Sequence, residues 1–550
     1  MKVLIPTDTI HPDNINMKKF LGKLHDSMKD EGSSNPSFPG NAPQHQQPMQ
    51  DQPSRIKPPT PQDVIRYRYQ QGTNLGSVFV LEQWLTPSMY PQRCQSAELA
   101  AATKSVETMG LEAARAKFEN HWNNYCSDAD LDWLANEAHC NSIRLPIGYF
   151  TLGPPYCQNT PFASVSLIYA NAWAAVKRLV ARCYSRGIGV LLDLHALPGG
   201  ANGQEHSGTN SGKADVWKHK SNLELATRCL CFIAKDAKSM DGVVGIQLCN
   251  EAEYNAPDMY KWYDRVIAEI GSIDNTMPLY ISDAWNLSQA IGYCNGRNSL
   301  QAGTANPIVI DTHLYWAFSD DDKRKSPQQI TQEVSGKLGE LDGKDGSVTD
   351  HGAAQMVVGE YSCVLTEDSW GKRGVHPKEK LVNDFGQAQS QRYQQRAGGS
   401  FFWTYRMDWM DGGEWGFKQQ TKIRAITPPN SLCLSPSDVQ SRLSHAQSQQ
   451  EGQLQSTMGA HCNYWDSTYP GQYEHWRFEQ GWRVGFNDAL AFFGMRANGG
   501  LQGHGGDKIG MLDIWVKKRI VESGQAGKNL WEFEQGLRQG VRDFYQLAGI

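Results

Sequence analysis

The sequence predicts an α/β protein built on a (β/α)8 barrel, the TIM-barrel fold, with additional segments at both ends. Two observations support this prediction: short apolar segments recur eight times between residues 77 and 406, and helix-like segments separate them. The apolar runs are continuous rather than alternating, which is typical of strands buried on both faces of a parallel sheet. Eight such strands with intervening helices indicate a closed barrel, whereas a doubly wound open sheet does not require eight units.

The eight candidate strands are rich in Val, Ile, Leu and aromatic residues. They are SVFVLEQW (77–84), SIRLPIGY (142–149), GVLLDLHA (189–196), GIQLCNEA (245–252), PLYISDA (278–284), PIVIDTHLY (307–315), QMVVGEYS (355–362) and GSFFWTYR (399–406). The segments between them include DADLDWLANEA and YANAWAAVKRLVARCYSRG, in which apolar residues recur at three- and four-residue spacing. This spacing predicts amphipathic helices, and Gly187 is a candidate helix terminator.

The segments outside the barrel have a different composition. Residues 1–62 are predicted to form a polar arm, because the stretch from about 28 to 62 is rich in Pro, Ser, Gln and Asn and offers little to bury. Residues 63–426 are assigned to the barrel, and residues 427–550 to a helical extension. Within the extension, residues 476–493 and 531–548 share the pattern W-x-F-E-Q-G-x-R-x-G-x-x-D, and the matching glycines predict two helices that cross closely. A hairpin packed on the barrel exterior and a surface for a partner or a homo-oligomer both remain open.

Composition disfavours several classes of partner. The net charge of −5 gives no basic surface for nucleic acid or anionic membranes, and no stretch reaches the roughly 18–20 apolar residues of a membrane span. The first residues lack the apolar run of a secretory signal. The 12 cysteines show no CxxC or metal-ligand spacing, and several lie in apolar segments, as Cys249 does, which favours buried free thiols. We therefore expect a cytoplasmic protein, or a secreted one if a leader belongs before this sequence.

Polar residues gather at the predicted carboxyl ends of the strands, where (β/α)8 enzymes hold their active sites. Glu251 and Glu360 end strands 4 and 7, which lie on opposite sides of an eight-membered ring, so we expect them to face each other. Two facing carboxylates suit glycosidic cleavage, because one donates a proton to the leaving oxygen while the other attacks the anomeric carbon. A separation of about 5–5.5 Å would give retention of configuration through a covalent intermediate.

The neighbours of the two glutamates indicate a division of roles. Arg144 on strand 2 is expected to point toward Glu360 and to favour its ionised form. Glu251 has no obvious cation beside it in the sequence, which suits the proton carrier. A metal site built from His195, His313 and the glutamates is the alternative. It is disfavoured because no H-x-H ends strand 1 and no Lys ends strand 4, so we expect neither a metal nor a cofactor.

These residues stand in motifs that resemble glycoside hydrolase family 5, and especially its fungal exo-β-1,3-glucanases (glucan 1,3-β-glucosidases). The matching stretches span about residues 70 to 420 and are GTNLGSVFVLEQWLTPSMY, SIRLPIGYF, LLDLHALPGGANGQEHSG, GIQLCNEA, THLYWAF, VVGEYSCVLTE and FFWTYRMD. The resemblance implies that Glu251 is the acid/base and Glu360 the nucleophile. It also implies a subsite for the glucose to be cleaved, lined by Arg144, His195, Asn250, His313 and Tyr315, with Trp403 as the sugar platform. Glu82, Asn202 and Glu205 would close a pocket suited to exo-action.

The sequence departs from the family pattern mainly on the leaving-group side. Ala252 replaces the usual proline after the acid/base, Gln204 stands where an aromatic residue is expected, and Glu205 replaces aspartate. The predicted function is therefore a retaining, exo-acting β-glucosidase or glucanase whose substrate is a β-1,3-glucan or a smaller β-glucoside. An endo-acting or transglycosylating enzyme of the same family and a non-catalytic carbohydrate-binding barrel are the alternatives.

Overall fold

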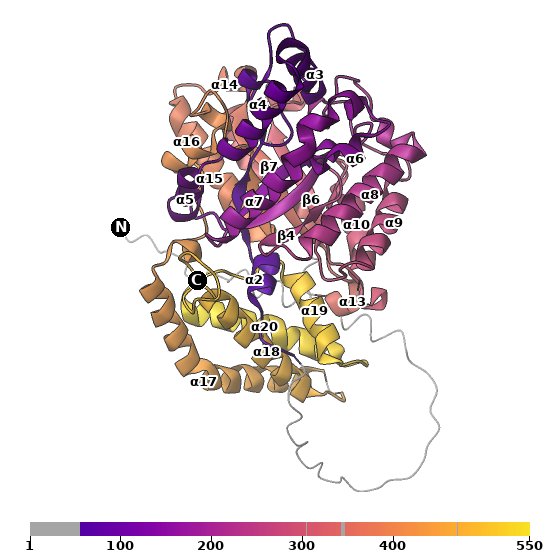
Figure 1. Cartoon of the computed structure of the whole chain (residues 1–550). Coiled ribbons are helices and arrows are strands. Elements are labelled where there is room, and N and C mark those ends of the chain that lie inside the picture. The colour runs from indigo at the N-terminus through magenta and orange to yellow at the C-terminus, as the bar shows by residue number, and fades with distance from the viewer. Residues whose placement is uncertain (1–55, 304, 343–346, 470) are drawn as a thin grey trace.

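The computed structural model describes residues 56–550 except 304, 343–346 and 470. Most of the predicted polar arm, residues 1–62, lies outside the described residues, and the described chain enters its first helix at Pro61. Eight parallel strands form a closed barrel in chain order, β1 to β8, so the predicted fold is confirmed (Figure 1). The strands are β1 (Gln70–Asn74), β2 (Ser142–Gly148), β3 (Gly189–Ala196), β4 (Val243–Gln247), β5 (Leu279–Ser282), β6 (Ile308–Trp316), β7 (Gln355–Leu365) and β8 (Gly399–Phe402).

Helices surround the barrel and continue beyond it. Those up to the end of the barrel are α2 (Pro61–Tyr67), α3 (Glu98–Met109), α4 (Leu111–Asn124), α5 (Asp128–Asn136), α6 (Pro154–Cys157), α7 (Ala172–Tyr184), α8 (Lys220–Ala237), α9 (Met259–Gly271), α10 (Leu287–Arg297), α11 (Asp320–Arg324), α12 (Pro327–Val334), α13 (Val348–His351), α14 (Glu367–Trp370), α15 (Lys378–Arg396) and α16 (Phe417–Lys422). The C-terminal helices are α17 (Pro436–Thr468), α18 (His475–Gly494), α19 (Leu512–Ser523) and α20 (Leu530–Ala548).

The prediction of the first strand was wrong. The strand is the polar segment 70–74, whereas the apolar run 77–84 follows it as a loop that is buried up to Leu81, ends at the exposed Trp84 and makes an isolated bridge from Phe79 to Ile147. Polar side chains of β1 find hydrogen-bond acceptors inside the barrel: the Gln70 amide N–H donates to the Tyr280 hydroxyl at 2.7 Å, and the Asn74 amide N–H donates to the Gly359 carbonyl at 2.9 Å. The other seven predicted strands overlap the observed ones.

The two similar segments form α18 and α20, which cross at glycines as predicted. A Cβ atom on Gly485 would lie 2.0 Å from the Leu537 carbonyl oxygen, and one on Gly540 would lie 2.1 Å from that of Trp482. The Trp482 indole N–H donates to Asp543 at 2.7 Å, which joins the first segment to the shared aspartate of the second across the crossing. Only residues without a side chain allow the two backbones to approach this closely.

The C-terminal helices cover the end of the barrel where the strands begin (Figure 1). Asp507 is buried and accepts hydrogen bonds from Arg68 (3.3 Å), which precedes β1, from Asn141 (3.0 Å), which precedes β2, and from Arg496 (2.8 Å). Gly187, before β3, has a φ of +72°, and a Cβ there would lie 2.1 Å from the Gln502 carbonyl oxygen. The predicted helix terminator is therefore also a point of close contact with the extension.

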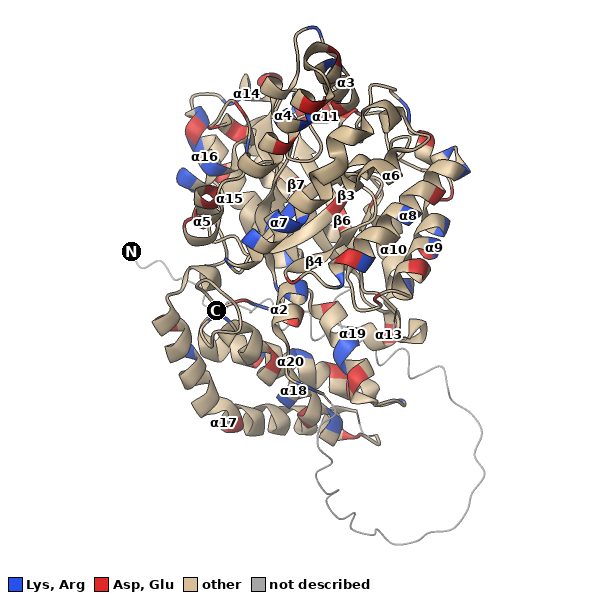
Figure 2. Ribbon diagram, in the orientation of Figure 1, with Lys and Arg blue, Asp and Glu red and all other residues tan. Residues whose placement is uncertain are grey.

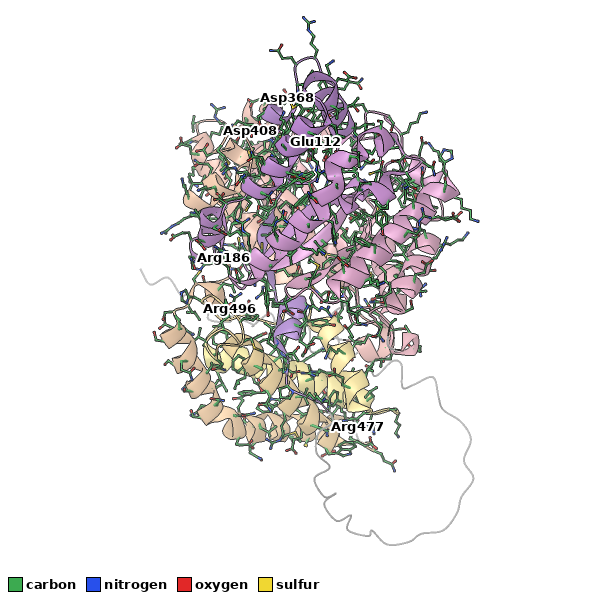
Figure 3. All side chains as sticks on the ribbon, viewed as in Figure 1. Glu112, Arg186, Asp368, Asp408, Arg477 and Arg496 are labelled. Carbon is green, nitrogen blue, oxygen red and sulfur yellow. The ribbon has the colours of Figure 1, made fainter. Side chains whose placement is uncertain are left out.

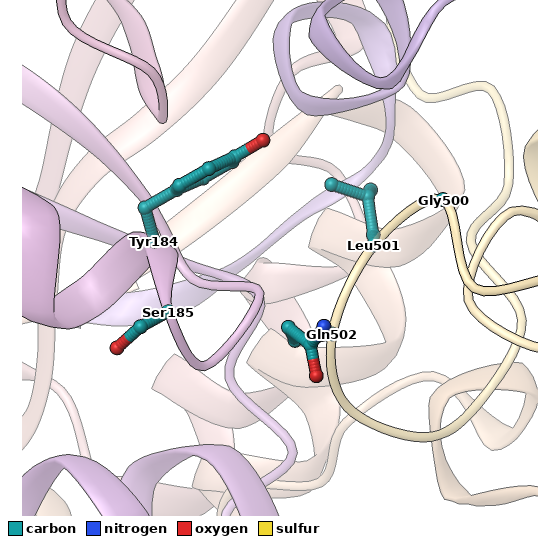
Figure 4. Close-up of a pocket in the computed structure, with 5 residues that line it drawn as sticks. All are labelled: Tyr184, Ser185, Gly500, Leu501 and Gln502. Carbon is teal, nitrogen blue, oxygen red and sulfur yellow. The ribbon is translucent and has the colours of Figure 1, made fainter.

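Residues labelled in Figure 3 mark the two ends of the barrel. Arg186 and Arg496 lie where the barrel meets the C-terminal helices, and Asp368 and Asp408, which follow β7 and β8, lie on the far side of the barrel. The carboxyl ends of the strands, where a (β/α)8 enzyme keeps its active site, therefore point away from the extension. A hollow of about 380 Å³ lies at the junction, between Tyr184 and Ser185 at the end of α7 and the loop Gly500–Gln502 (Figure 4).

The distribution of surface charge and the state of the cysteines match what the composition predicted. Basic and acidic residues are interspersed along the outer helices in Figure 2, in keeping with the net charge of −5. No helix within the described part of the chain combines the length and apolar character needed to cross a membrane. All 12 cysteines are free thiols, and most of them, Cys249 included, are buried.

Candidate active site

Glu251 and Glu360 lie together at the carboxyl end of the barrel. Glu251 follows β4, Glu360 is part of β7, and His313 on β6 stands beside both. One carboxylate oxygen of each glutamate and the His313 Nδ1 atom lie within 4.8 Å of one another. The expected facing pair is therefore present.

Glu360 is held by a cation and a phenol. Arg144 Nη1 donates to Glu360 Oε1 at 2.9 Å, and the Tyr315 hydroxyl donates to Oε2 at 2.8 Å. Burial works against the charge on Arg144, but Asp193, Asp311 and Glu360 outweigh it and raise the pKa of the guanidinium. Burial and the charge of Glu360 raise the pKa of Tyr315 well above its ordinary value, so the phenol keeps its proton and remains a donor.

Arg144 also orients a chain of polar groups next to the pair. Its Nη2 atom donates to Asn250 Oδ1 at 2.7 Å, which turns the Asn250 amide nitrogen toward His195 Nε2 at 3.4 Å. His195 Nδ1 lies 2.7 Å from Asp193 Oδ2, so Nδ1 carries the donated proton and Nε2 is the acceptor. The predicted residues Arg144, Asn250 and His195 thus form one connected network whose orientation is fixed.

Glu251 has two histidines beside it, contrary to the prediction of no neighbouring cation. His313 Nδ1 donates to Oε1 at 2.8 Å, and His206 Nε2 lies 3.3 Å from Oε2. Burial alone would raise the pKa of Glu251, but hydrogen bonds from His206 and His313 lower it well below its ordinary value. Burial likewise opposes the charge on His313, but Glu360 and Asp311 outweigh it and raise its pKa. In the free protein these contacts favour the ionised form of Glu251 and the protonated forms of its histidines.

His206 is a site residue that the sequence did not single out. Burial opposes its charge, but Glu251, Glu82 and Glu360 outweigh burial and raise the pKa of its imidazole. It lies in the short 3₁₀ helix Glu205–Ser207 after β3. The signal was its place in the motif GANGQEHSG, one residue after Glu205.

The backbone of Glu251 is strained and braced. Its φ of +40° lies in the left-handed region, which a residue with a side chain enters at a cost of about 1–3 kcal/mol. The Asn202 amide donates to the Glu251 carbonyl at 2.9 Å, and the Ala252 N–H donates to the Ser282 hydroxyl at 3.2 Å. Asn202 was predicted to help close the pocket. Its observed hydrogen bond holds the backbone of Glu251 and so helps to orient the Glu251 side chain.

The remaining predicted residues lie around the rim of the site. Glu82, in the loop after β1, accepts a hydrogen bond from the Trp84 indole at 2.8 Å, and burial raises its pKa. Glu205 is exposed and accepts a hydrogen bond from Ser96, which links the loops after β3 and β1. Trp403, at the end of β8, is buried and its ring lies parallel to that of His195, with centroids 5.9 Å apart.

A row of aromatic rings continues from the nucleophile side to the surface. Tyr315 contacts Phe318 (5.5 Å between ring centroids) and Trp415 (5.9 Å), and Trp415 contacts Trp84 (5.3 Å). Phe318 and Trp84 are 68% and 41% exposed, so the row presents apolar surface at the edge of the site. Such a surface suits the part of a substrate that extends out of the mouth.

The donors around the pair argue against the metal alternative. Both oxygens of Glu360 accept hydrogen bonds, one of them from the permanently charged Arg144. A divalent cation there would lie against that guanidinium and compete with it for the same carboxylate. The same contacts suit a carboxylate whose charge is neutralised by forming a bond to substrate.

Comparison with known proteins places this site in a family context. A family model described as cellulase (glycosyl hydrolase family 5) matches residues 100–398, and one described as the C-terminal domain of glucan 1,3-beta-glucosidase 3 matches residues 446–548. Glucan 1,3-beta-glucosidase 3 of Schizosaccharomyces pombe is 29% identical over 86% of this chain and 95% of its own length. An uncharacterized glycosyl hydrolase of Saccharomyces cerevisiae is 28% identical over 88% of this chain and 92% of its own. The crystal structure of rutinosidase from Aspergillus niger covers 66% of this chain and 99% of its own, with a TM-score of 0.51 and 18% identity, and supports the fold.

Proposed function

Because this chain belongs to glycosyl hydrolase family 5 and is therefore a glycosidase, we propose that it is a retaining, exo-acting enzyme that releases terminal β-D-glucosyl residues. The observation that carries the retaining mechanism is the approach of the two carboxylates, whose oxygens lie within 4.8 Å. Retaining enzymes hold their carboxyl groups about 5–5.5 Å apart, whereas inverting enzymes need about 6.5–9.5 Å to admit a water molecule between carboxylate and substrate.

Glu360 is the proposed nucleophile. It attacks the anomeric carbon and forms a covalent ester as the bond to the leaving oxygen breaks and that oxygen takes a proton from Glu251. Water, deprotonated by Glu251, then attacks the same carbon and releases Glu360. Arg144 and Tyr315 favour this role because each donates to one Glu360 oxygen and holds the carboxylate in a fixed orientation.

The proton for the leaving group comes from the cluster of Glu251, His206 and His313. Substrate displaces water from Glu251, and desolvation raises the pKa of a carboxyl group. The proton that the flanking histidines hold in the free enzyme then passes to Glu251 along the hydrogen bonds of 2.8 Å and 3.3 Å. After the ester forms, the negative charge of Glu360 is gone, which weakens the hold of His313 on its proton.

The exo mode is supported by the closure of the mouth on one side. The loops after β1 and β3 are joined by the Ser96–Glu205 hydrogen bond and by the Ala97 N–H, which donates to Asn210 Oδ1 at 3.1 Å. A closed end leaves room for a terminal sugar and none for a chain that runs through. The curated relatives named glucan 1,3-beta-glucosidase favour glucose as that sugar, and a β-1,3-glucan or a smaller β-glucoside as the substrate.

The test is hydrolysis of an aryl β-D-glucoside and of linkage-defined glucosides, with the anomeric configuration of the product followed by NMR. We expect β-glucose as the first product, and a loss of kcat of roughly a thousand-fold or more in Glu360→Gln, because the nucleophile is removed. Exposed Glu379→Gln on α15 serves as the control and keeps its activity. First formation of α-glucose, or full activity of Glu360→Gln, would contradict the mechanism, and internal cleavage of a glucan would contradict the exo mode.

A further inference from the structure

We propose that the C-terminal helices carry a Zn²⁺ site formed by His461, His475 and Glu532, separate from the catalytic mouth. The three residues come from α17, α18 and α20, in that order. Glu532 Oε2 lies 3.3 Å from His461 Nε2 and 3.0 Å from His475 Nδ1, and each of the three residues offers one ligand atom within 4.8 Å of those of the other two. Two imidazoles and one carboxylate are a ligand set that Zn²⁺ uses in proteins.

The spacing of the atoms suits coordination. Zn²⁺ holds nitrogen and oxygen ligands at about 2.0–2.2 Å, which in a tetrahedron separates neighbouring ligand atoms by roughly 3.3–3.5 Å. The two separations from Glu532, 3.3 Å and 3.0 Å, are close to this value. An ion enters this triangle with small movements of the side chains, leaving a fourth position for water.

The surroundings hold each ligand in place. Glu532 is fully buried, and its other oxygen accepts the Glu474 N–H at 2.7 Å. His475 Nε2 faces Asp466 Oδ1 at 3.2 Å, which is the carboxylate contact that orients metal-binding histidines in many proteins. The His461 ring stacks on Phe478 with centroids 3.8 Å apart.

The repeated pattern singles out Glu532. Within W-x-F-E-Q-G, the residue after tryptophan is Arg477 in the first segment and Glu532 in the second. Arg477 lies at the outer edge of the extension (Figure 3), where it contacts Glu474 and Gln525. At the equivalent position of α20 the chain instead buries a carboxylate against two histidines, and a buried charge requires a compensating partner.

A metal-free hydrogen-bonded network is the competing account. It requires N–H groups on His461 Nε2 and on both nitrogens of His475, because all three face carboxylate oxygens. Zn²⁺ replaces the two protons that face Glu532 and leaves His475 with the single proton it donates to Asp466. The bound ion would connect α17 to the crossing pair α18 and α20. We therefore expect it to raise the stability of the folded protein.

The experiment uses the full chain, freed of metal with EDTA and dialysed, and titrated with ZnCl₂ by calorimetry and by thermal unfolding. We expect one equivalent bound and a melting temperature that rises by several degrees. His475→Ala, which changes the partly exposed ligand, and Glu532→Gln should lose both effects. His445→Ala, an exposed histidine on the same helix as His461, should keep both, and so should Glu251→Gln, which alters the catalytic mouth.

Cobalt provides a second readout that does not depend on the stability of the variants. Co²⁺ added to the metal-free wild-type chain should give the intense visible absorption of a tetrahedral N/O site, and His475→Ala should lack it while its circular dichroism remains that of the wild type. Absence of Zn²⁺ binding by the wild type, or binding unchanged in His475→Ala and Glu532→Gln, would overturn the proposal in favour of the hydrogen-bonded network.

Discussion

At Glu251 a single carboxylate accepts hydrogen bonds from two histidines, one on a strand of the barrel and one on a loop. His313 comes from β6 and His206 from the loop after β3. Their protons lower the pKa of Glu251, although burial alone would raise it. The acidity of the proposed proton donor is therefore set by a loop residue as much as by a strand residue.

Replacing His206 should raise the pKa of Glu251. In His206→Ala the carboxylate loses one of the hydrogen bonds that favour its ionised form, while burial continues to favour the protonated form. The measurement is a ¹³C NMR titration of labelled glutamate side chains, with the Glu251 signal assigned from Glu251→Gln. Gln204→Ala, two residues away in the same loop, should leave the titration of Glu251 unchanged. A Glu251 pKa that falls or stays the same in His206→Ala would contradict the role of His206.

A second prediction for a single residue concerns Glu98, whose ionisation should affect the stability of the protein. It is fully buried on α3, where it accepts hydrogen bonds from the Leu81 N–H at 2.8 Å and the Tyr169 hydroxyl at 2.9 Å. Burial raises its pKa to about 8. An unfolded chain releases this proton near pH 4.5, so the folded state holds more protons between these values and loses stability as pH rises.

Glu98→Gln removes this titration while keeping the shape of the protonated side chain. We therefore expect the stability of Glu98→Gln, relative to the wild type, to improve steadily from pH 5 to pH 8. Urea unfolding at a series of pH values measures this difference. A difference that is flat with pH would show that Glu98 is ionised in the folded protein.

The predicted site residues at or near the strand ends are fixed by strand register. Glu251, Glu360, Arg144 and His313 stand at or near strand ends, so barrel geometry alone brings them together. His206 and the bracing contact of Asn202 depend on the path of one loop. Hydrophobic pattern carries no information about that path, which is why His206 was missed.

Among the elements, the first strand shows how local pattern and tertiary context compete. The segment 77–84 has the composition of a strand, yet the barrel uses QQGTN. Gln70 and Asn74 are acceptable there because each donates a side-chain amide N–H to an acceptor on another strand. Those partners lie hundreds of residues away in the sequence, so the pattern of neighbouring residues cannot predict them. The close crossing of α18 and α20 was predictable, because the glycines repeat in the sequence itself.

Gly485→Ala should destabilise the extension. The added methyl group would lie 2.0 Å from the Leu537 carbonyl oxygen, so the helices must separate. Overpacking of this kind costs about 1–3 kcal/mol in the free energy of unfolding, which urea denaturation measures.

Gly459→Ala on α17 is the matched control. Its Cβ would meet nothing within 4 Å, and alanine stabilises a helix interior relative to glycine by roughly 0.5–1 kcal/mol. The two substitutions are chemically identical and should have opposite signs. Equal effects would mean that close approach does not govern the crossing.

For the whole molecule, the decisive contact is the buried ionic cluster that joins the segment before β1 to the C-terminal extension below the barrel. Arg68 is fully buried, and burial lowers the pKa of its guanidinium to about 10 despite the opposing charge of Asp507. Arg496 shares the same carboxylate. The cluster therefore contains two arginines that depend on one aspartate.

Asp507→Asn should cost about 3–5 kcal/mol of stability, because removing one member leaves uncompensated buried charge. Thermal and urea unfolding report this loss. Activity measured well below the melting temperature should change little, since the cluster lies at the end of the barrel opposite the mouth. Glu451→Gln, which breaks an exposed pair with Arg483, should cost at most about 1 kcal/mol. A loss in Asp507→Asn no greater than in this control would contradict the account.

The same cluster has a consequence for how the chain is made. Arg68 meets its carboxylate 439 residues later in the sequence. A ribosome releases the chain from its amino end, so Arg68 emerges long before the aspartate that pairs with it. The buried cluster at the lower end of the barrel can form only after Asp507 has been synthesised, and a chain truncated before Asp507 would leave this end open to chaperones and proteases.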